Sequence, residues 1–473
     1  MFSSKFRYRW EILSGPFLFF LSLFLLRESW GSASAAAVGL TFWMAAWWVL
    51  RPVPIAVTAF LPIAVNSFFS LIPMDRVVSE YFSDIVILLL GSDLICLTWT
   101  TTGLDRRISI KALGHIGPSM KQQITVWLVA SAVLSIFLPN VVVAAIFCPI
   151  AAAMLRACGV EDPSKSLLAA PIFLAIGWGS GIGGFGSPIG SSANLVAISY
   201  IEKMTGQEFM YGEWVIRFLP LLACIILLNL LFLLHMKYPA MTGNCTKSYF
   251  EGLSKGFGPM GRGERTSLIL FSAATLLAFL RPFFADILPD MKPAYVFLTI
   301  GLLLFFLQDE KGRPMLTWSY AEGHAMWGMM FLFASGMALG KILIETGAVD
   351  HLSALLAASS ITGGFPAMLL FCAFSALFSE ISSNTAAASV AIPIVISLSA
   401  ALGLNPVPYV IASIVSANCA YILPISTRAI PVSYGLSAAL QIRQGLVLSL
   451  LSILATALIC TLLTEILPMY SHF

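Results

Sequence analysis

The chain has 473 residues, of which 59% are hydrophobic and 10% are charged, and its formal net charge is +3. Because soluble domains carry roughly 25% charged residues, this composition excludes a soluble globular protein. The small net charge gives no indication of nucleic-acid binding. Apolar segments long enough to cross a bilayer, which takes about 20 helical residues, predict an all-α, multi-pass membrane protein.

The first part of the chain alternates apolar segments with short polar connections. We expect transmembrane spans at about 12–27, 34–50, 53–73 and 84–104. Basic residues precede the first span, and no small-residue cleavage site follows it. These features predict a retained first helix rather than a signal peptide.

Two shorter apolar arms follow, and they are joined at Leu138-Pro139-Asn140. The arms, at about 122–138 and 141–157, are each marginal for a full crossing. Residues 122–157 are therefore predicted to form a re-entrant hairpin, which enters and leaves by one face of the membrane.

A glycine-rich stretch at 177–190 interrupts the next apolar segment, at about 166–200. So much glycine inside an apolar segment predicts a broken helix, and irregular backbone at membrane depth is tolerated where it lines a cavity. A span at about 214–236 follows, and residues 237–265 are expected to form a cytoplasmic linker.

The second half repeats this plan. Spans are expected at about 266–288, 294–308 and 324–345, a hairpin at 364–402, a broken helix at 407–440 and a last span at 445–467. The hairpin arms meet at Ser382-Ser383-Asn384-Thr385, and residues 424–431 interrupt the broken helix.

The two halves share a sequence register. Asn140 and Asn384 lie 244 residues apart (384 − 140), and Thr102-Gly103 falls on Thr346-Gly347 at the same offset. A register held over this distance indicates a duplicated unit, with residues 1–236 and 266–473 as the two copies. The span count gives about eleven crossings, two hairpins that enter from opposite faces, and hence inverted repeats.

The basic connections predict which side each loop occupies. With a cytoplasmic N-terminus, they all fall on the inner side, as the positive-inside rule requires. We therefore expect a multi-pass protein of a bacterial inner membrane or of an organelle inner envelope. The eight cysteines are scattered singly, and we interpret them as small apolar side chains, not as disulfides or metal ligands. The sequence contains no HExxH, GxSxG or Walker motif that would indicate an enzyme.

Hairpin junctions and broken helices at matching positions are the strongest indication of a binding site in such a protein. At the second junction, Ser379, Ser383, Asn384 and Thr385 offer hydroxyl and amide oxygens suited to Na⁺ and to an anion. The alternative is ordinary hydrogen bonding between membrane helices.

The first half offers a smaller oxygen set. Ser135 and Asn140 are the counterparts at the first junction, whereas Pro139 and Val141 replace hydroxyl residues. The residues after the two helix breaks are also candidates, with capping of a restarting helix as the alternative. They are Ser191, Ser192, Asn194, Ser426 and Thr427.

Arg428 is the most informative single charge, because an unpaired cation inside a span costs several kcal/mol. Its functional interpretation is a bidentate partner for a carboxylate or sulfate. The alternatives are an ion pair with Glu380 or Asp93, or extension of the side chain to the membrane surface.

These motifs resemble the divalent anion/sodium symporter (DASS) family of dicarboxylate, citrate and sulfate transporters. Ser383-Asn384-Thr385 followed by Pro393 is similar to the Ser-Asn-Thr signature of that family, and the stretch from Ser187 to Val196 is similar to its broken-helix motif. The resemblance covers the chain from about residue 35 onward.

The resemblance implies a homodimer, an elevator-type transport cycle and Na⁺ sites at both junctions. One Na⁺ site would comprise Ser379, Ser383 and Asn384 with backbone from 424–427, and the other Ser135 and Asn140 with backbone near Gly190. Substrate would be bound by a larger set of polar residues. These are Asn140, Ser191, Ser383, Asn384, Thr385, Thr427 and Arg428.

We therefore expect secondary active transport of small divalent anions, dicarboxylates first, driven by Na⁺ or by anion counter-exchange. The chain departs from the family pattern at Pro139-Asn140-Val141 and at Thr427-Arg428-Ala429. These departures leave open a sulfate or other oxyanion transporter with weak or no Na⁺ coupling, and a proton-coupled transporter of a related superfamily. A membrane-embedded enzyme would require clustered acids or histidines, and a passive channel would not saturate.

Overall fold

The computed structural model describes residues 4–471 apart from 115–116, 118, 161, 164–165, 239–244 and 352–362. The described residues form helices and one isolated β-bridge, between Gln308 and Pro314. Ten of the helices in this part of the chain are long and apolar enough to cross a membrane, and four shorter apolar helices accompany them. The predicted all-α, multi-pass fold is confirmed.

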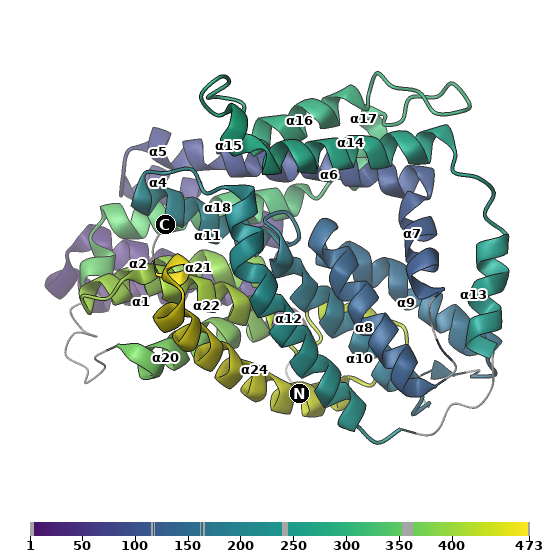
Figure 1. The fold of residues 1–473 in the computed structure, drawn as a ribbon. Helices are drawn as coiled ribbons and strands as arrows, with labels where there is room; N and C mark the ends of the chain where they lie inside the picture. The colour runs from purple at the N-terminus through teal and green to yellow at the C-terminus, as the bar shows by residue number, and fades with distance from the viewer. Residues whose placement is uncertain are drawn as a thin grey trace.

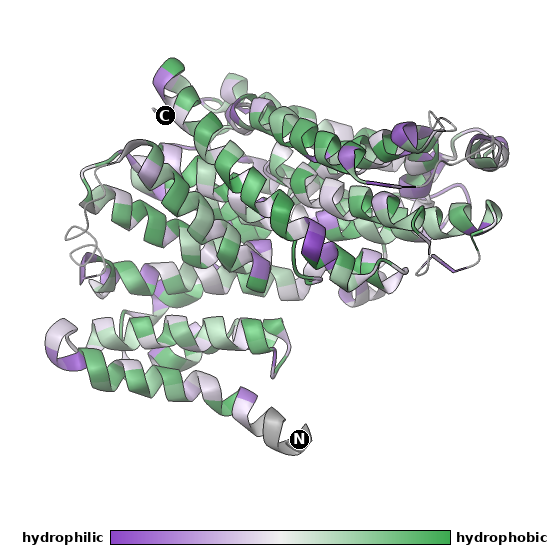
Figure 2. Cartoon of the chain, turned by 90° about the horizontal axis from the view of Figure 1, so that it is seen from below, coloured by the Kyte–Doolittle hydropathy of each residue, from purple (hydrophilic) through white to green (hydrophobic). Residues whose placement is uncertain are grey.

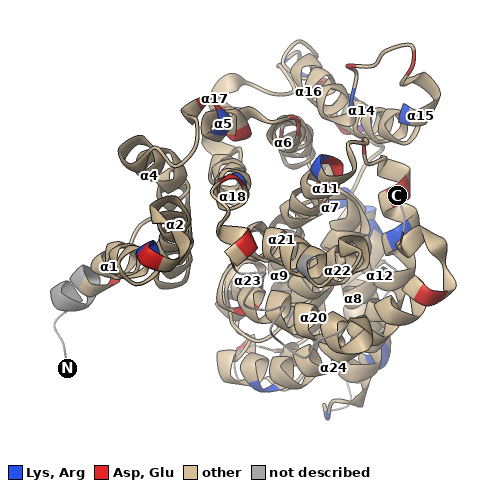
Figure 3. Ribbon diagram, turned by 90° about the vertical axis from the view of Figure 1, so that its left-hand side faces the viewer, with Lys and Arg blue, Asp and Glu red and all other residues tan. Residues whose placement is uncertain are grey.

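The helices α1 (Ser4–Trp30) and α2 (Ser32–Leu50) form an antiparallel pair that stands to one side of the main body (Figure 3). Gly39 permits this close pairing, because a Cβ there would lie 2.8 Å from the carbonyl oxygen of Phe19. The expected span 53–73 is instead divided into α3 (Ile55–Thr58) and α4 (Leu61–Phe69). Proline in the first turn of α4 favours a new helix start.

The helix α6 (Asp84–Thr102) packs against α14 (Arg262–Phe279) and α16 (Pro293–Leu303), as the upper part of Figure 1 shows. Both α14 and α16 are shorter than the spans expected there. Figure 2 shows that apolar residues predominate along the long helices. The remaining elements of this part are α5 (Met74–Val78), η1 (Ser79–Phe82), α7 (Leu104–Leu113), α15 (Arg281–Phe284), α17 (Trp318–His324) and α18 (Trp327–Glu345).

The first hairpin region comprises α8 (Met120–Phe137) and α9 (Asn140–Ala157), followed by α10 (Ala169–Gly183). The glycines of α10 remain helical, contrary to the expectation that the chain unwinds from residue 177. They serve close packing instead, since a Cβ on Gly183 would lie 2.1 Å from the carbonyl oxygen of Ala132 on α8.

The chain leaves the α-helical conformation only at 184–191, which we call the first break. It includes the 3₁₀ turn η3 (Gly184–Gly186) and ends at α11 (Ser192–Thr205). The helix α12 (Tyr211–His235) then crosses beside α10.

The second hairpin region comprises α20 (Gly364–Ile381) and α21 (Asn384–Ala401), followed by α22 (Pro406–Asn418). The second break, residues 419–428, includes the 3₁₀ turn η4 (Ser426–Arg428) and begins earlier than the interruption expected at 424–431. The chain continues as α23 (Ala429–Ser433), α24 (Ala438–Ile466) and η5 (Pro468–Tyr470).

The linker between the halves contains an amphipathic helix, α13 (Cys245–Lys255), which packs on α7 and α9. A disulfide joins Cys158 to Cys245, so the prediction that none of the cysteines is disulfide-bonded was wrong. The two residues are 87 positions apart, and packing of α13 against the end of α9, not sequence spacing, brings them together. Arg107 on α7 forms an ion pair with Glu264 on α14 at 2.7 Å. Burial acts to raise the pKa of Glu264, but its hydrogen bonds and the Arg107 charge hold that pKa below its usual value.

Candidate functional site

The second junction lies between α20 and α21, where the backbone leaves one helix and starts the next. Ser383 caps α21, because its side chain accepts a hydrogen bond from the N–H of Ala386 at 3.2 Å. One turn earlier on α20, the Ser379 hydroxyl lies 3.1 Å from Asn384 Oδ1 and 2.6 Å from the carbonyl oxygen of Ala417. Three oxygen atoms from α20, α21 and α22 therefore converge at one point.

A chain of amide side chains extends from this point into the first half of the protein. Asn384 Nδ2 donates to Asn418 Oδ1 at 3.3 Å, and Asn418 Nδ2 donates to Asn194 Oδ1 at 3.3 Å. Asn194 in turn donates to the carbonyl oxygens of Gly184 and Ser187, each at 2.8 Å. Asn194 and Asn418 are buried, and these bonds connect the second junction, the end of α22 and the first break in one polar network.

A pair of hydroxyls makes a second connection between the halves. Ser192, at the start of α11, and Thr385, at the start of α21, lie 2.5 Å apart through their hydroxyl oxygens. Both helices begin at this contact, so their N-terminal N–H groups and partial positive charges lie near it. This arrangement is suited to an anion that accepts hydrogen bonds from both halves.

The first junction contains a group of backbone oxygens around Gly190. A Cβ on Gly190 would lie 2.6 Å from the carbonyl oxygens of both Ser135 and Gly184, and 3.1 Å from that of Ile136. Only a residue without a side chain fits this position. The Ser135 hydroxyl points elsewhere, donating to the carbonyl oxygen of Ser180 at 2.7 Å.

Asn140 begins α9 and is only partly buried. Its Oδ1 accepts a hydrogen bond from the N–H of Val141 at 2.9 Å. Within the described residues, no hydrogen bond joins Asn140 to Gly190, to Ser135 or to Asn384. The structure thus brings Asn384 into a network between the halves, whereas the side chain of its repeat counterpart stays local.

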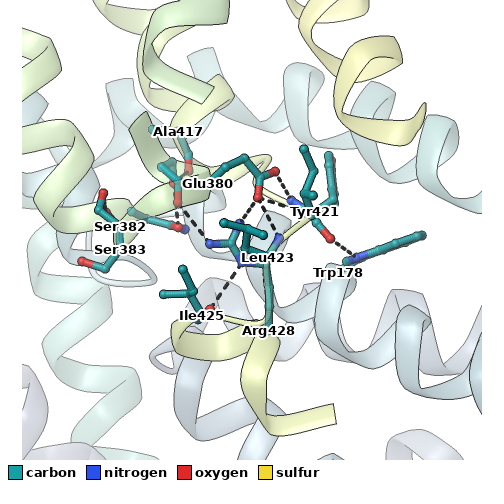
Figure 4. Close-up of polar contacts among 12 residues, drawn as sticks. Trp178, Glu380, Ser382, Ser383, Ala417, Tyr421, Leu423, Ile425 and Arg428 are labelled. Carbon is teal, nitrogen blue, oxygen red and sulfur yellow. Dashed lines mark hydrogen bonds and ion pairs between the residues drawn. The ribbon is translucent and has the colours of Figure 1, made fainter. Parts of the chain in front are cut away.

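Arg428 is buried and forms an ion pair with Glu380, with 2.8 Å between Nη1 and Oε2 (Figure 4). Its Nη2 donates to the carbonyl oxygen of Ser379 at 3.1 Å, and its Nε donates to that of Ile425 at 3.3 Å. Of the alternatives that the sequence leaves open, the structure contains the ion pair with Glu380. The guanidinium therefore lies beside the Ser379 oxygens, with its charge balanced by a protein carboxylate.

The Glu380 carboxylate also explains why the second break begins early. It accepts hydrogen bonds from the N–H groups of Tyr421 at 2.6 Å, Ile422 at 2.9 Å and Leu423 at 3.2 Å. These donors would otherwise bond to carbonyl groups one turn earlier in a continuing helix. Tyr421 fixes the break further, because its hydroxyl accepts from Asn229 on α12 and Ser452 on α24.

Each hairpin region contacts the break of the opposite half or the helix that follows it. The helix α21 packs against α11, and α9 packs against η4 and α23. The hydroxyls of Ser191 in the first break and Thr427 in the second have no protein hydrogen-bond partner within the described residues. Both residues are buried.

Comparison with known proteins agrees with this arrangement. Residues 8–470 match the family described as the sodium:sulfate symporter transmembrane region. The chain belongs to this family. The family resemblance predicted from the motifs is confirmed, and the protein is a multi-pass membrane transporter, not an enzyme.

Two curated members of similar length carry the same description, sodium-dependent dicarboxylate transporter SdcS. The protein from Staphylococcus saprophyticus is 26% identical over 466 residues, which covers 95% of this chain and 90% of that protein. The protein from Staphylococcus aureus strain NCTC 8325 is 28% identical over 455 residues, covering 92% of this chain and 86% of that protein.

A solved structure, the YdaH transporter of Alcanivorax borkumensis, has a similar fold. The TM-score is 0.54 at 14% sequence identity, and the match covers 83% of this chain and 87% of that chain. At this identity the likeness concerns the fold alone.

Sequence reasoning missed three features of this symporter's site. Asn418 was not singled out, because a lone polar residue near the end of an apolar helix gives no signal of its own. The role of Glu380 as an acceptor for three N–H groups is equally invisible in the sequence. The backbone oxygen of Ala417, which accepts a hydrogen bond from the Ser379 hydroxyl, was not foreseen beside the predicted stretch 424–427.

Proposed function

We propose that this family member transports small dicarboxylates by coupling them to Na⁺, and that the substrate binds where α11 and α21 begin. The observation that carries the proposal is the Ser192–Thr385 contact together with the amide chain Asn384–Asn418–Asn194. Together these contacts connect the second junction to the first break through one hydrogen-bond network. Two relatives described as sodium-dependent dicarboxylate transporters support this choice of substrate.

The residues present suit Na⁺, which prefers oxygen ligands. At the second junction, Ser379 Oγ, Asn384 Oδ1 and the Ala417 carbonyl oxygen would hold one ion. At the first junction, the carbonyl oxygens of Ser135 and Gly184 beside Gly190 would hold another, a cradle that any side chain at 190 would fill. Exposed carbonyls and half-helix ends are the usual cation ligands in transporters of this kind.

The substrate carboxylates would be bound by hydroxyls and N–H groups rather than by a free cation. Ser192 and Thr385 contribute hydroxyls at two helix N-termini. Ser191 in the first break and Thr427 in the second would contribute further hydroxyls, which have no hydrogen-bond partner within the described residues. Bound Na⁺ would balance part of the anion's charge, so that binding of both Na⁺ and substrate would favour movement of the transport unit across the membrane. Arg428 stays a predicted substrate ligand, although its ion pair with Glu380 competes with that role.

The test is uptake of radiolabelled succinate into proteoliposomes, with an inward Na⁺ gradient and with K⁺ in its place. The proposal expects saturable uptake that requires Na⁺ and is inhibited by malate and by 2-oxoglutarate. Equal uptake in the two salts would exclude Na⁺ coupling. Repeating the assay without Na⁺ at an acidic and an alkaline pH tests the alternative of a proton-coupled transporter from a related superfamily. Faster uptake at the acidic pH would indicate proton coupling.

A second candidate is exchange or uptake of sulfate or another oxyanion with little Na⁺ dependence. The observation in its favour is that Asn140 Oδ1 accepts from the N–H of Val141 and, within the described residues, Asn140 makes no hydrogen bond to Gly190. Counterflow distinguishes the two candidates. Vesicles preloaded with sulfate, citrate or succinate are compared for trans-stimulated uptake, and stimulation by sulfate alone would favour the second.

We further propose that the protein works as a homodimer with an elevator cycle, with inverted repeats at 1–236 and 266–473 and a cytoplasmic N-terminus. The crossed packing of α21 on α11 and of α9 on α23 supports a single moving unit built from both halves. The membrane would be a bacterial inner membrane or an organelle inner envelope.

A further inference from the structure

A cavity of about 390 Å³ opens where the start of α10, the end of α12 and the start of α24 meet. These three helix ends converge in the lower part of Figure 1. The polar residues that line it are His235, Lys237, Tyr238, Arg443 and Gln444. Its charged residues are basic, and no aspartate or glutamate lies among the lining residues.

The two cations of this cavity differ from the lysines and arginines that the protein pairs with its own carboxylates. The side chains of Lys203, Lys341 and Arg281 each bond to a carboxylate, as do those of Arg107, Lys292 and Arg428. The side chains of Lys237 and Arg443 are exposed and have no ion pair or hydrogen bond within the described residues. Two unpaired cations that face one cavity favour an anionic ligand.

The rest of the cavity is apolar and continues onto the outer surfaces of two long helices. Leu167, with 69% of its surface exposed, Phe232 and Leu440 form its wall. Exposed leucines follow along α12 at 231 and 227, and along α24 at 446 and 450. A basic end beside a long apolar surface matches a molecule with an anionic head and hydrocarbon chains, not a free anion.

We propose that this cavity binds the phosphate headgroup of an anionic diacyl phospholipid, with its acyl chains lying along α12 and α24. Basic pockets between helices on the cytoplasmic side suit such headgroups, and the sequence predicts that side for this end of the protein. The site is connected to the transport region, because Asn229 of α12 and Ser452 of α24 both bond to the Tyr421 hydroxyl.

The experiment is native mass spectrometry of the full-length protein, with phosphatidylglycerol or phosphatidylcholine of identical acyl chains. Wild-type protein is expected to retain phosphatidylglycerol about tenfold more than phosphatidylcholine. The double variant Lys237→Gln/Arg443→Gln is expected to lose this preference. The matched control is Arg262→Gln/Arg265→Gln, which removes the same charge from exposed positions on the predicted same side and keeps the preference.

Several results would overturn the proposal. Retention of phosphatidylglycerol unchanged in Lys237→Gln/Arg443→Gln, or equal loss in both double variants, would show that the cavity does not select the lipid. Equal retention of the two lipids by wild-type protein would exclude headgroup recognition. Displacement of phosphatidylglycerol by an equimolar amount of inorganic phosphate would assign the site to the free anion. The variant Lys237→Arg/Arg443→Lys keeps both charges and should retain the preference for phosphatidylglycerol. If it does, the loss in Lys237→Gln/Arg443→Gln is due to the missing charges and not to misfolding.

Discussion

At the scale of single residues, the same side-chain type serves different roles according to its neighbours. The Ser383 hydroxyl caps its own helix, whereas the Ser379 hydroxyl contacts a carbonyl from another helix. Thr385, two positions beyond Ser383, contacts the opposite half through Ser192. Of the three, Thr385 is the residue whose loss should affect substrate binding without removing a helix cap.

The variant Thr385→Val keeps the shape of the side chain and removes its hydroxyl. We expect KM for succinate to rise about tenfold, since a lost hydrogen bond of this kind is worth about 1.4 kcal/mol. Ser389→Ala is the control, because among the described residues that hydroxyl bonds to the carbonyl oxygen of Thr385 in its own helix and to no other group. Initial uptake rates over a range of succinate concentrations measure both. An unchanged KM in Thr385→Val would remove the residue from the site.

The Glu380–Arg428 ion pair gives a prediction about stability. Glu380→Gln should lower the free energy of unfolding by about 3–5 kcal/mol, because it leaves a buried guanidinium without its counter-charge. Arg428→Met should lower it less, by about 1–3 kcal/mol, because Glu380 keeps three N–H donors.

Thermal unfolding in detergent measures the order of these two variants. Equal losses, or a larger loss for Arg428→Met, would contradict the assignment of Glu380 as the organiser of the second break. If Arg428→Met left thermal stability unchanged and raised KM, Arg428 would act on substrate and not on the fold.

At the scale of elements, the two breaks differ although the sequence register is shared. The first break depends on glycine, which lets Gly190 approach the carbonyls of α8. The second break depends on the Glu380 carboxylate of α20, which accepts hydrogen bonds from backbone N–H groups just after the end of α22. Irregular backbone at membrane depth is therefore stabilised by close packing in the first break and by a charged side chain in the second.

The linker helix α13 supports a prediction about the cysteines. Alkylation of the denatured protein without reductant should modify six cysteines, those other than Cys158 and Cys245, and reduction beforehand should raise the number to eight. Intact-mass spectrometry counts the adducts. Eight adducts without reductant would contradict the disulfide between Cys158 and Cys245 in the purified protein.

At the scale of the whole molecule, the halves are interleaved and not placed side by side. The second junction depends on the first break through Asn418, and α9 depends on α23 through packing. A unit assembled from both halves can move as one body, which is what an elevator requires of it.

The proposed homodimer is tested by light scattering of the protein purified in mild detergent. The expected protein mass is twice 51.1 kDa, after subtraction of the bound detergent. A mass of 51.1 kDa over the full concentration range would contradict the dimer.

Hydropathy, the repeat register and the Ser-Asn-Thr motif are local signals, so the amino-acid sequence sufficed to predict the membrane class, the family and the candidate oxygens at Ser379, Asn384 and Thr385. It could not show that Gly183 serves helix packing, that Glu380 ends α22, or that Asn418 connects the halves. These three points required the folded structure, since each depends on which atoms of a distant segment come within hydrogen-bond or contact distance. The disulfide between Cys158 and Cys245 is of the same kind, because the docking of α13 on α9 creates it.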